Sequence, residues 1–187
     1  MALFDIRTEA VPAGSQRSSR PARHLDLMWA ALASCALAGP LLVPPSPVLV
    51  WNASASSPLG LYRISAPVDL APGDMVVAWL PASMRRLAAK RSYLPFDVPL
   101  VKPVAASAGA RVCAKGAYVL VDGRLAAVRR ALDRSGRLLP WWSGCRLLGE
   151  GELFLLSTSA TDAFDGRYFG VTRAKELVGK ARLVWRG

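Results

Sequence analysis

Histidine is nearly absent from this 187-residue chain, which has a single one, His24, beside a basic N-terminal stretch. Catalytic systems of the Ser-His-Asp or Cys-His kind need a histidine next to the nucleophile, so the composition argues against them. Cysteine is scarce as well, because the chain has only Cys35, Cys113 and Cys145. A structural zinc site normally takes four Cys or His ligands at paired spacings, so we expect no metal.

The phosphate-binding loops GxxxxGK[ST] and GxGxxG are also missing, so no nucleotide cofactor is expected. A hydrolase with this composition must therefore work with Ser, Lys, Asp or Glu. What the chain does have is a hydrophobic content of 52% and a mean hydropathy of +0.27. Such a chain can bury a core, and its length suits one compact domain with room for an appended element.

The N-terminal part contains the longest uncharged run. Between Asp26 and Arg63 there is no charged residue, and the run Leu27–Val43 is almost wholly apolar. Seventeen residues of helix span roughly 25 Å, slightly less than the ~30 Å hydrocarbon core of a bilayer. Arginines precede the run and none directly follows it, which favours a cytoplasmic N-terminus. We therefore expect a cytoplasmic basic tail at 1–24, a transmembrane anchor at 25–50 and a periplasmic domain at 51–187, in the inner membrane.

Two other interpretations of this segment remain open. A basic start followed by small residues also suits a cleaved signal peptide. The Leu32-Ala33-Ser34-Cys35 sequence resembles a lipoprotein cleavage box, with Cys35 as the lipidated residue. In a plain anchor, Cys35 is simply a small apolar helix residue.

Positive charge dominates the chain, with 24 Lys and Arg against 13 Asp and Glu, a net charge of +11. Beside a membrane, this charge favours anionic lipid headgroups as a partner. No basic stripe with interleaved aromatic residues is visible, so a solvated surface is the simpler interpretation and no specific nucleic acid partner is expected.

The part outside the expected anchor is typical of a mainly β fold. An Asp-Gly pair between two short apolar runs predicts a hairpin over 117–128, since this pair suits a two-residue turn. Further strands are expected at 75–80, 98–106, 152–156 and 182–185, with a short helix at 82–91. In an oxidising periplasm Cys113 and Cys145 can form a disulfide, and two buried free thiols are the alternative.

Three segments contain candidates for chemistry. The first, from Asn52 to Tyr62, has three serines followed by Pro and Gly, which is typical of a loop that exposes hydroxyls and equally of a plain linker. The second contains Lys102, which lies in an apolar run. Burial there lowers the pKa of its amine, which could then accept a serine proton, unless the side chain extends from an edge strand to water. The third contains Asp165 and Arg167, which are placed to form an ion pair that fixes a turn.

The order and content of these segments resemble the membrane-anchored signal peptidases with a Ser-Lys dyad, most closely the TraF-type peptidases of conjugative transfer. The resemblance covers about residues 51–186. It makes Ser56, two residues before Pro58, the nucleophile and Lys102 the general base. It also implies that the backbone N–H of Ser56 and the hydroxyl of Ser54 stabilise the oxyanion, and that Asp165 and Arg167 support the site.

The resemblance also implies a fold and a function. It implies a signal-peptidase-like β domain that removes leader segments from exported precursors, here the pilin or mating-pore precursor of a conjugative system. A general type I signal peptidase and a non-enzymatic, membrane-tethered basic binding module are the alternatives.

The sequence departs from the family pattern at three places. Pro103 follows Lys102 where arginine is usual, and Ser107-Ala108-Gly109 replaces a turn that usually contains Pro-Gly. Ala163 stands where a hydroxyl residue often bonds the lysine. Thr161 and Ser159 are the nearby hydroxyl residues that could replace it.

Overall fold

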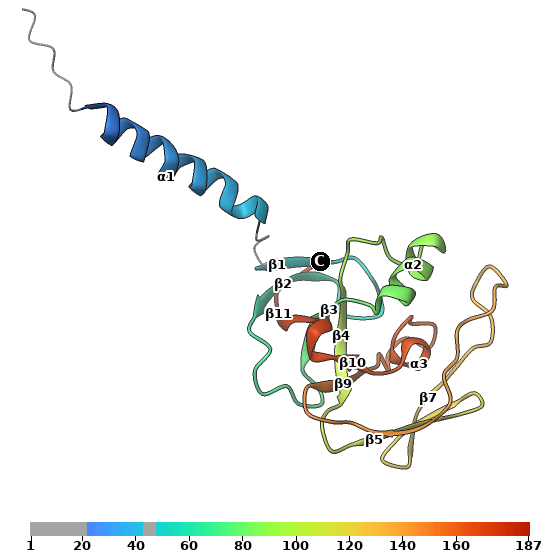
Figure 1. Cartoon of the computed structure of the whole chain (residues 1–187). Coiled ribbons are helices and arrows are strands. Elements are labelled where there is room, and N and C mark those ends of the chain that lie inside the picture. Colours follow the sequence, from blue (N-terminus) through green and yellow to red (C-terminus); the bar gives the residue numbers. More distant parts are fainter. Residues whose placement is uncertain (1–21, 43–47) are drawn as a thin grey trace, which may run out of the picture. The chain divides into compact units, whose positions relative to one another are not determined.

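The computed structural model describes residues 22–42 and 48–187, and within the first range it describes the side chains of 25–36. The chain divides into two units, 1–45 and 46–187. The first contains helix α1, Ala22–Leu42 (Figure 1). Among the described residues, no helix combines the length and the apolarity needed to cross a bilayer. The expected tail at 1–24 and the segment 43–47 lie outside the described residues, apart from the first helical turn.

The second unit contains a seven-stranded sheet in which all neighbouring strands are antiparallel. Its order is β1-β2-β11-β3-β4-β9-β10. The strands are β1 Leu49–Asn52, β2 Gly60–Ser65, β3 Met75–Ala78, β4 Leu100–Ala106, β9 Glu152–Leu155, β10 Thr172–Arg173 and β11 Leu177–Arg186. The C-terminal strand β11 therefore lies between β2 and β3, so the end of the chain joins the N-terminal hairpin to the strand beside β4.

A glycine permits the close approach of β2 and β11. The φ angle of Gly60 is 143°, and a Cβ atom built there would lie 2.1 Å from the carbonyl oxygen of Trp185. A side chain at this position would push β11 away from β2. Gly60 therefore lets the strand pairing begin directly after the serine loop.

A smaller sheet of four strands has the order β7-β6-β5-β8. Its strands are β5 Arg111–Lys115, β6 Tyr118–Val121, β7 Arg124–Val128 and β8 Gly144–Leu147. Cys113 and Cys145 are directly opposite in the β5–β8 pairing, and a disulfide joins them. Positive φ angles at Asp122 and Gly123 form the turn of the β6–β7 hairpin.

The hydrophobic core lies where β3, β4 and β9 meet helix α2, Ala82–Lys90. The buried side chains of this cluster include Val76, Leu80, Ala88, Val104 and Leu155. Two short helices follow β9, α3 Gly166–Phe169 and the 3-10 helix η1 Ala174–Glu176. Strand β4, which contains Lys102, therefore lies inside the sheet between β3 and β9.

The mainly β prediction is confirmed, and so are the hairpin and the helix over 82–90. The strands β1, β2, β5, β8 and β10 were not predicted. β1 and β8 are four residues long and largely exposed, so their sequences lack the apolar alternation of a half-buried strand. β1 begins at Leu49, just before the end expected for the anchor at residue 50.

Candidate active site

The loop between β1 and β2 contains the serine cluster, and the buried side chain of Asn52 organises it. Its Nδ2 donates to the carbonyl oxygens of Ser54, Ser57 and Pro58, at 3.0, 3.2 and 3.0 Å. Its Oδ1 accepts from the backbone N–H of Ser54 at 3.1 Å. One amide thus replaces the backbone pairing that a tight loop lacks. Asn52 is part of the serine motif in the sequence, but its sequence position alone did not indicate this role.

Two more contacts attach the loop to the sheet. Ser57 is buried, and its Oγ donates to the carbonyl oxygen of Val101 in β4 at 2.9 Å. The hydroxyl of Tyr62 donates to the carbonyl oxygen of Pro58 at 2.8 Å. The backbone on both sides of Ser56 is therefore held, while the Ser56 side chain is only partly buried.

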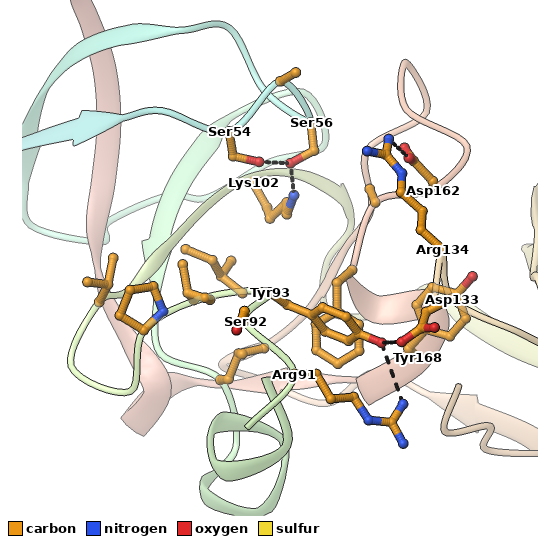
Figure 2. Close-up of a pocket in the computed structure, with 18 of the residues that line it drawn as sticks. Ser54, Ser56, Arg91, Ser92, Tyr93, Lys102, Asp133, Arg134, Asp162 and Tyr168 are labelled. Carbon is orange, nitrogen blue, oxygen red and sulfur yellow. Dashed lines mark hydrogen bonds and ion pairs between the residues drawn. The ribbon is translucent and has the colours of Figure 1, made fainter. Parts of the chain in front are cut away.

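The structure brings Ser54, Ser56 and Lys102 together, although Lys102 is 46 residues from Ser56 (Figure 2). The hydroxyls of Ser54 and Ser56 share a hydrogen bond of 2.8 Å. The Nζ of Lys102 donates a short hydrogen bond to the Ser56 Oγ. The side chains lie in the order hydroxyl, hydroxyl, amine, so that a proton from Ser56 has an acceptor within reach.

Burial sets the protonation of the amine. Lys102 is 4% exposed in the interior strand β4, opposite Val76 of β3. This burial lowers the pKa of the Lys102 amine from 10.5 to about 8. The Asp165 carboxylate works against the shift, and the Arg167 guanidinium adds to it. With a pKa of about 8, about a tenth of the amine is neutral at pH 7.

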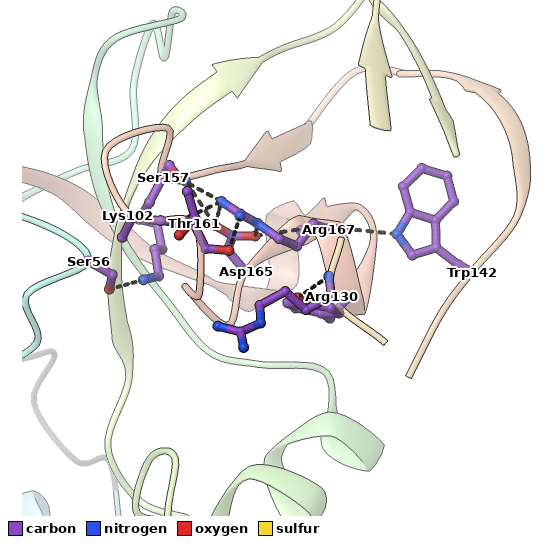
Figure 3. Close-up of polar contacts among 11 residues, drawn as sticks. Ser56, Lys102, Arg130, Trp142, Ser157, Thr161, Asp165 and Arg167 are labelled. Carbon is purple, nitrogen blue, oxygen red and sulfur yellow. Dashed lines mark hydrogen bonds and ion pairs between the residues drawn. The ribbon is translucent and has the colours of Figure 1, made fainter. Parts of the chain in front are cut away.

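Asp165 and Arg167 form a buried ion pair beside this lysine (Figure 3). The Arg167 Nε donates to Asp165 Oδ1 at 2.8 Å, and both side chains are almost fully buried. Arg167 also donates to the carbonyl oxygens of Ser157 and Thr161, at 2.6 and 2.9 Å. Burial raises the pKa of the Asp165 carboxyl, and the donors of Arg167 oppose that rise. The pair thus fixes the loop after β9 and acts on Lys102 through its charges.

The hydroxyl residues near Ala163 do not replace the hydroxyl that often bonds the lysine in the family. Ala163, which stands where the family often has a hydroxyl residue, is buried and lines the cleft. Thr161 contributes its carbonyl oxygen to Arg167, and no hydrogen bond links Lys102 to Thr161 or Ser159 within residues 48–187. Ser56 is the partner that the structure gives to the amine.

Ser157 is a neighbour of Lys102 that the sequence alone did not reveal. Val104 pairs with Leu155, and the Leu156 N–H donates to the carbonyl oxygen of Pro103, so Ser157 follows opposite Lys102. The Ser157 hydroxyl is buried and has no hydrogen-bond partner in the described part of the chain. Its position at the end of an apolar strand was the available signal, but the pairing register was needed to interpret it.

A cleft of about 810 Å³ opens at Ser56 and Lys102. Ser56, Lys102 and neighbouring residues of β4 line one side of it, and the segment 130–139 lines another (Figure 2). Its size suits a peptide segment rather than a single small ion. Within residues 22–42 and 48–187, no cluster of three His, Cys, Asp or Glu side chains is placed to hold a metal.

Comparison with known proteins identifies the family. Residues 22–186 match the family described as signal peptidase, peptidase S26. The plasmid transfer protein TraF of Escherichia coli is 34% identical over 148 residues, which cover 72% of this chain and 82% of that protein. Signal peptidase I of Enterococcus faecalis V583 is similar to 63% of this chain over 98% of its own, with 17% identity and a TM-score of 0.34. The chain therefore belongs to the S26 family of signal peptidases and is of the TraF type.

Proposed function

We propose that this protein is a serine endopeptidase that uses a Ser56–Lys102 dyad to remove leader segments from exported precursors. The hydrogen bond between the Lys102 amine and the Ser56 hydroxyl is the observation that supports this proposal most directly. A buried amine with a pKa of about 8 can accept a proton at physiological pH, which an ordinary lysine cannot do efficiently.

The acylation step follows from this geometry. The Ser56 Oγ attacks the scissile carbonyl carbon while its proton passes to the neutral Lys102 Nζ. The backbone N–H of Ser56 and the hydroxyl of Ser54 stabilise the oxyanion, and loss of one such donor typically costs about 10²–10³ in rate. The C–N bond then breaks, and the Lys102 ammonium returns the proton to the leaving amine.

Deacylation repeats the same proton path. Water attacks the ester carbon while Lys102 accepts the water proton. The C–O bond to Ser56 breaks, and Lys102 returns the proton to its Oγ. Asp165 and Arg167 do not exchange protons here; their ion pair keeps the loop after β9 in place beside Lys102.

The substrate and the location are inferred from separate observations. The likeness to a plasmid transfer protein supports a pilin or mating-pore precursor of a conjugative system as the substrate. The uncharged run within 25–50 and the arginines before it support an inner-membrane anchor, with residues 1–24 in the cytoplasm and 51–187 in the periplasm. Such an anchor would hold Ser56 near the lipid surface, where precursors emerge.

Mass spectrometry of a co-expressed candidate precursor tests the proposal. The full chain should release the leader, and Ser56→Ala and Lys102→Met should abolish release because the two residues act as a unit. Ser143→Ala and Lys115→Met make the same changes at exposed sites and should leave processing intact. Full processing by either dyad variant would overturn the proposal. Processing of ordinary secretory precursors alone would point to a general signal peptidase, and salt-sensitive binding with no cleavage would point to a binding module.

A further inference from the structure

The cleft wall formed by the segment 130–139 and its neighbours has more positive than negative charge. Its charged residues other than Lys102 are Arg91, Arg130, Arg134, Arg137, Asp133 and Asp162. Each aspartate is paired with an arginine, since Arg134 bonds Asp162 and the Arg137 Nε donates to Asp133 at 2.7 Å. Arg91 and Arg130 therefore form no ion pair on this wall. The hydrogen bond from Arg134 lowers the pKa of the Asp162 carboxyl, and the charge of Arg130 helps to lower it.

The guanidinium of Arg91 binds the protein's own backbone. The Arg91 Nη1 donates to the carbonyl oxygen of Leu138 at 2.7 Å, so its guanidinium holds the segment 130–139 in place. Arg130 differs from it. In residues 22–42 and 48–187, no acidic side chain lies within ion-pair distance of the Arg130 guanidinium, and the residue is exposed.

The backbone of Arg130 is nevertheless fixed. Its N–H donates to the hydroxyl of Tyr168 at 3.1 Å, and its carbonyl oxygen accepts from Trp141 Nε1 at 3.1 Å. Tyr168 is buried, and the preceding residue, Arg129, is buried and donates to the carbonyl oxygen of Trp142 at 2.7 Å. In Figure 3 the Arg130 guanidinium extends toward the side of the view where Ser56 and Lys102 lie.

A guanidinium that extends from a fixed backbone into a concave site is suited to a carboxylate, which it can bind with two parallel hydrogen bonds. We propose that Arg130 forms a carboxylate-binding subsite that selects precursors with an acidic group near the scissile bond. This group is either an Asp or Glu side chain of the precursor or its C-terminal carboxylate, where only a short segment follows the scissile bond. The inference rests on the proposed peptidase function, because it assumes that the cleft holds a peptide.

Cleavage of a peptide series by the full chain in detergent tests this subsite. The series moves one Asp along a precursor-derived peptide, with Asn at the same positions as the reference, and includes ends with free and amidated carboxyl groups. We expect Asp at one position, or the free end, to raise kcat/KM by about fivefold, as one partly exposed charge pair would. Arg130→Ala should remove that preference and leave cleavage of the Asn peptides unchanged. Arg130→Glu should favour Lys at the same position.

Arg124→Ala is the matched control, because it removes the same charge from the exposed strand β7, outside the cleft lining. Equal loss of preference in this variant would mean that general charge, not Arg130, attracts the acid, and would overturn the inference. No acidic preference at any position, with cleavage that still depends on Ser56, would overturn the subsite and leave the peptidase proposal standing.

A binding measurement keeps the inference testable if no peptide is cut. Fluorescent Asp and Asn peptides are titrated against the Ser56→Ala protein with and without Arg130→Ala. The subsite requires tighter binding of the Asp peptide that Arg130→Ala removes. Equal binding of both peptides would refute it.

Discussion

Ser57 and Val101 link the two halves of the candidate dyad: the Ser57 Oγ donates to the Val101 carbonyl oxygen at 2.9 Å. Ser57 follows Ser56 in the chain, and Val101 precedes Lys102. A hydrogen bond between the neighbours therefore limits how far the hydroxyl and the amine can separate. Small changes in the distance between the two reacting groups matter, because a misplacement of about 1 Å can cost about a hundredfold in rate.

Removal of this link should reduce kcat more than it affects substrate binding. For Ser57→Ala we expect a loss of about tenfold in kcat with KM little changed, and a stability cost of about 1 kcal/mol for one buried hydrogen bond. Single-turnover cleavage and urea unfolding measure the two effects. Tyr62→Phe removes a bond to the same loop without the link to β4, and should affect kcat less. Equal kcat losses in the two variants would argue against a special role for the link.

Asn52→Asp tests the organisation of the serine loop. The carboxylate keeps the shape and the acceptor for the Ser54 N–H, but it cannot donate to the three carbonyl oxygens. We expect kcat to fall by about a hundredfold, because Ser54 and Ser56 lose their fixed positions. Normal activity in a folded Asn52→Asp protein would mean that the remaining contacts of the loop are sufficient.

The pH dependence of cleavage should report the Lys102 amine. In the proposed mechanism only the neutral amine accepts the Ser56 proton, so kcat/KM should rise about tenfold per pH unit below the pKa of Lys102 and level off above about 8. Initial rates between pH 6 and pH 9.5 are the measurement. A profile that is flat across pH 8 would be incompatible with Lys102 as the base.

The Asp165–Arg167 pair should contribute to stability as well as to geometry. Asp165→Ala leaves the Arg167 guanidinium buried without its partner, which typically costs about 3–5 kcal/mol. Arg134→Ala breaks an exposed pair with Asp162, and there we expect less than about 1 kcal/mol, because Arg134 is 84% exposed. Urea unfolding of both variants provides the comparison. Similar small losses would show that burial does not distinguish the two pairs.

Local sequence patterns determined much of the fold. The Asp122-Gly123 pair predicted its hairpin because few residues adopt positive φ angles at both turn positions. Apolar runs predicted β3, β4 and β9, since strands buried on both faces need continuous apolar sequence. The apolar run around Lys102 also pointed to a desolvated amine. These features depend on residues within a few positions of each other.

The tertiary structure alone decided which distant groups meet. It placed β11 between β2 and β3, Ser157 opposite Lys102, and Arg130 on the wall of the cleft that opens at Ser56. It also assigned to Asn52 the four hydrogen bonds that hold the serine loop. Contacts of this kind depend on strand register and on the packing of loops against sheets. A short stretch of sequence does not encode them, because the partners are tens of residues apart and each is equally compatible with several pairings.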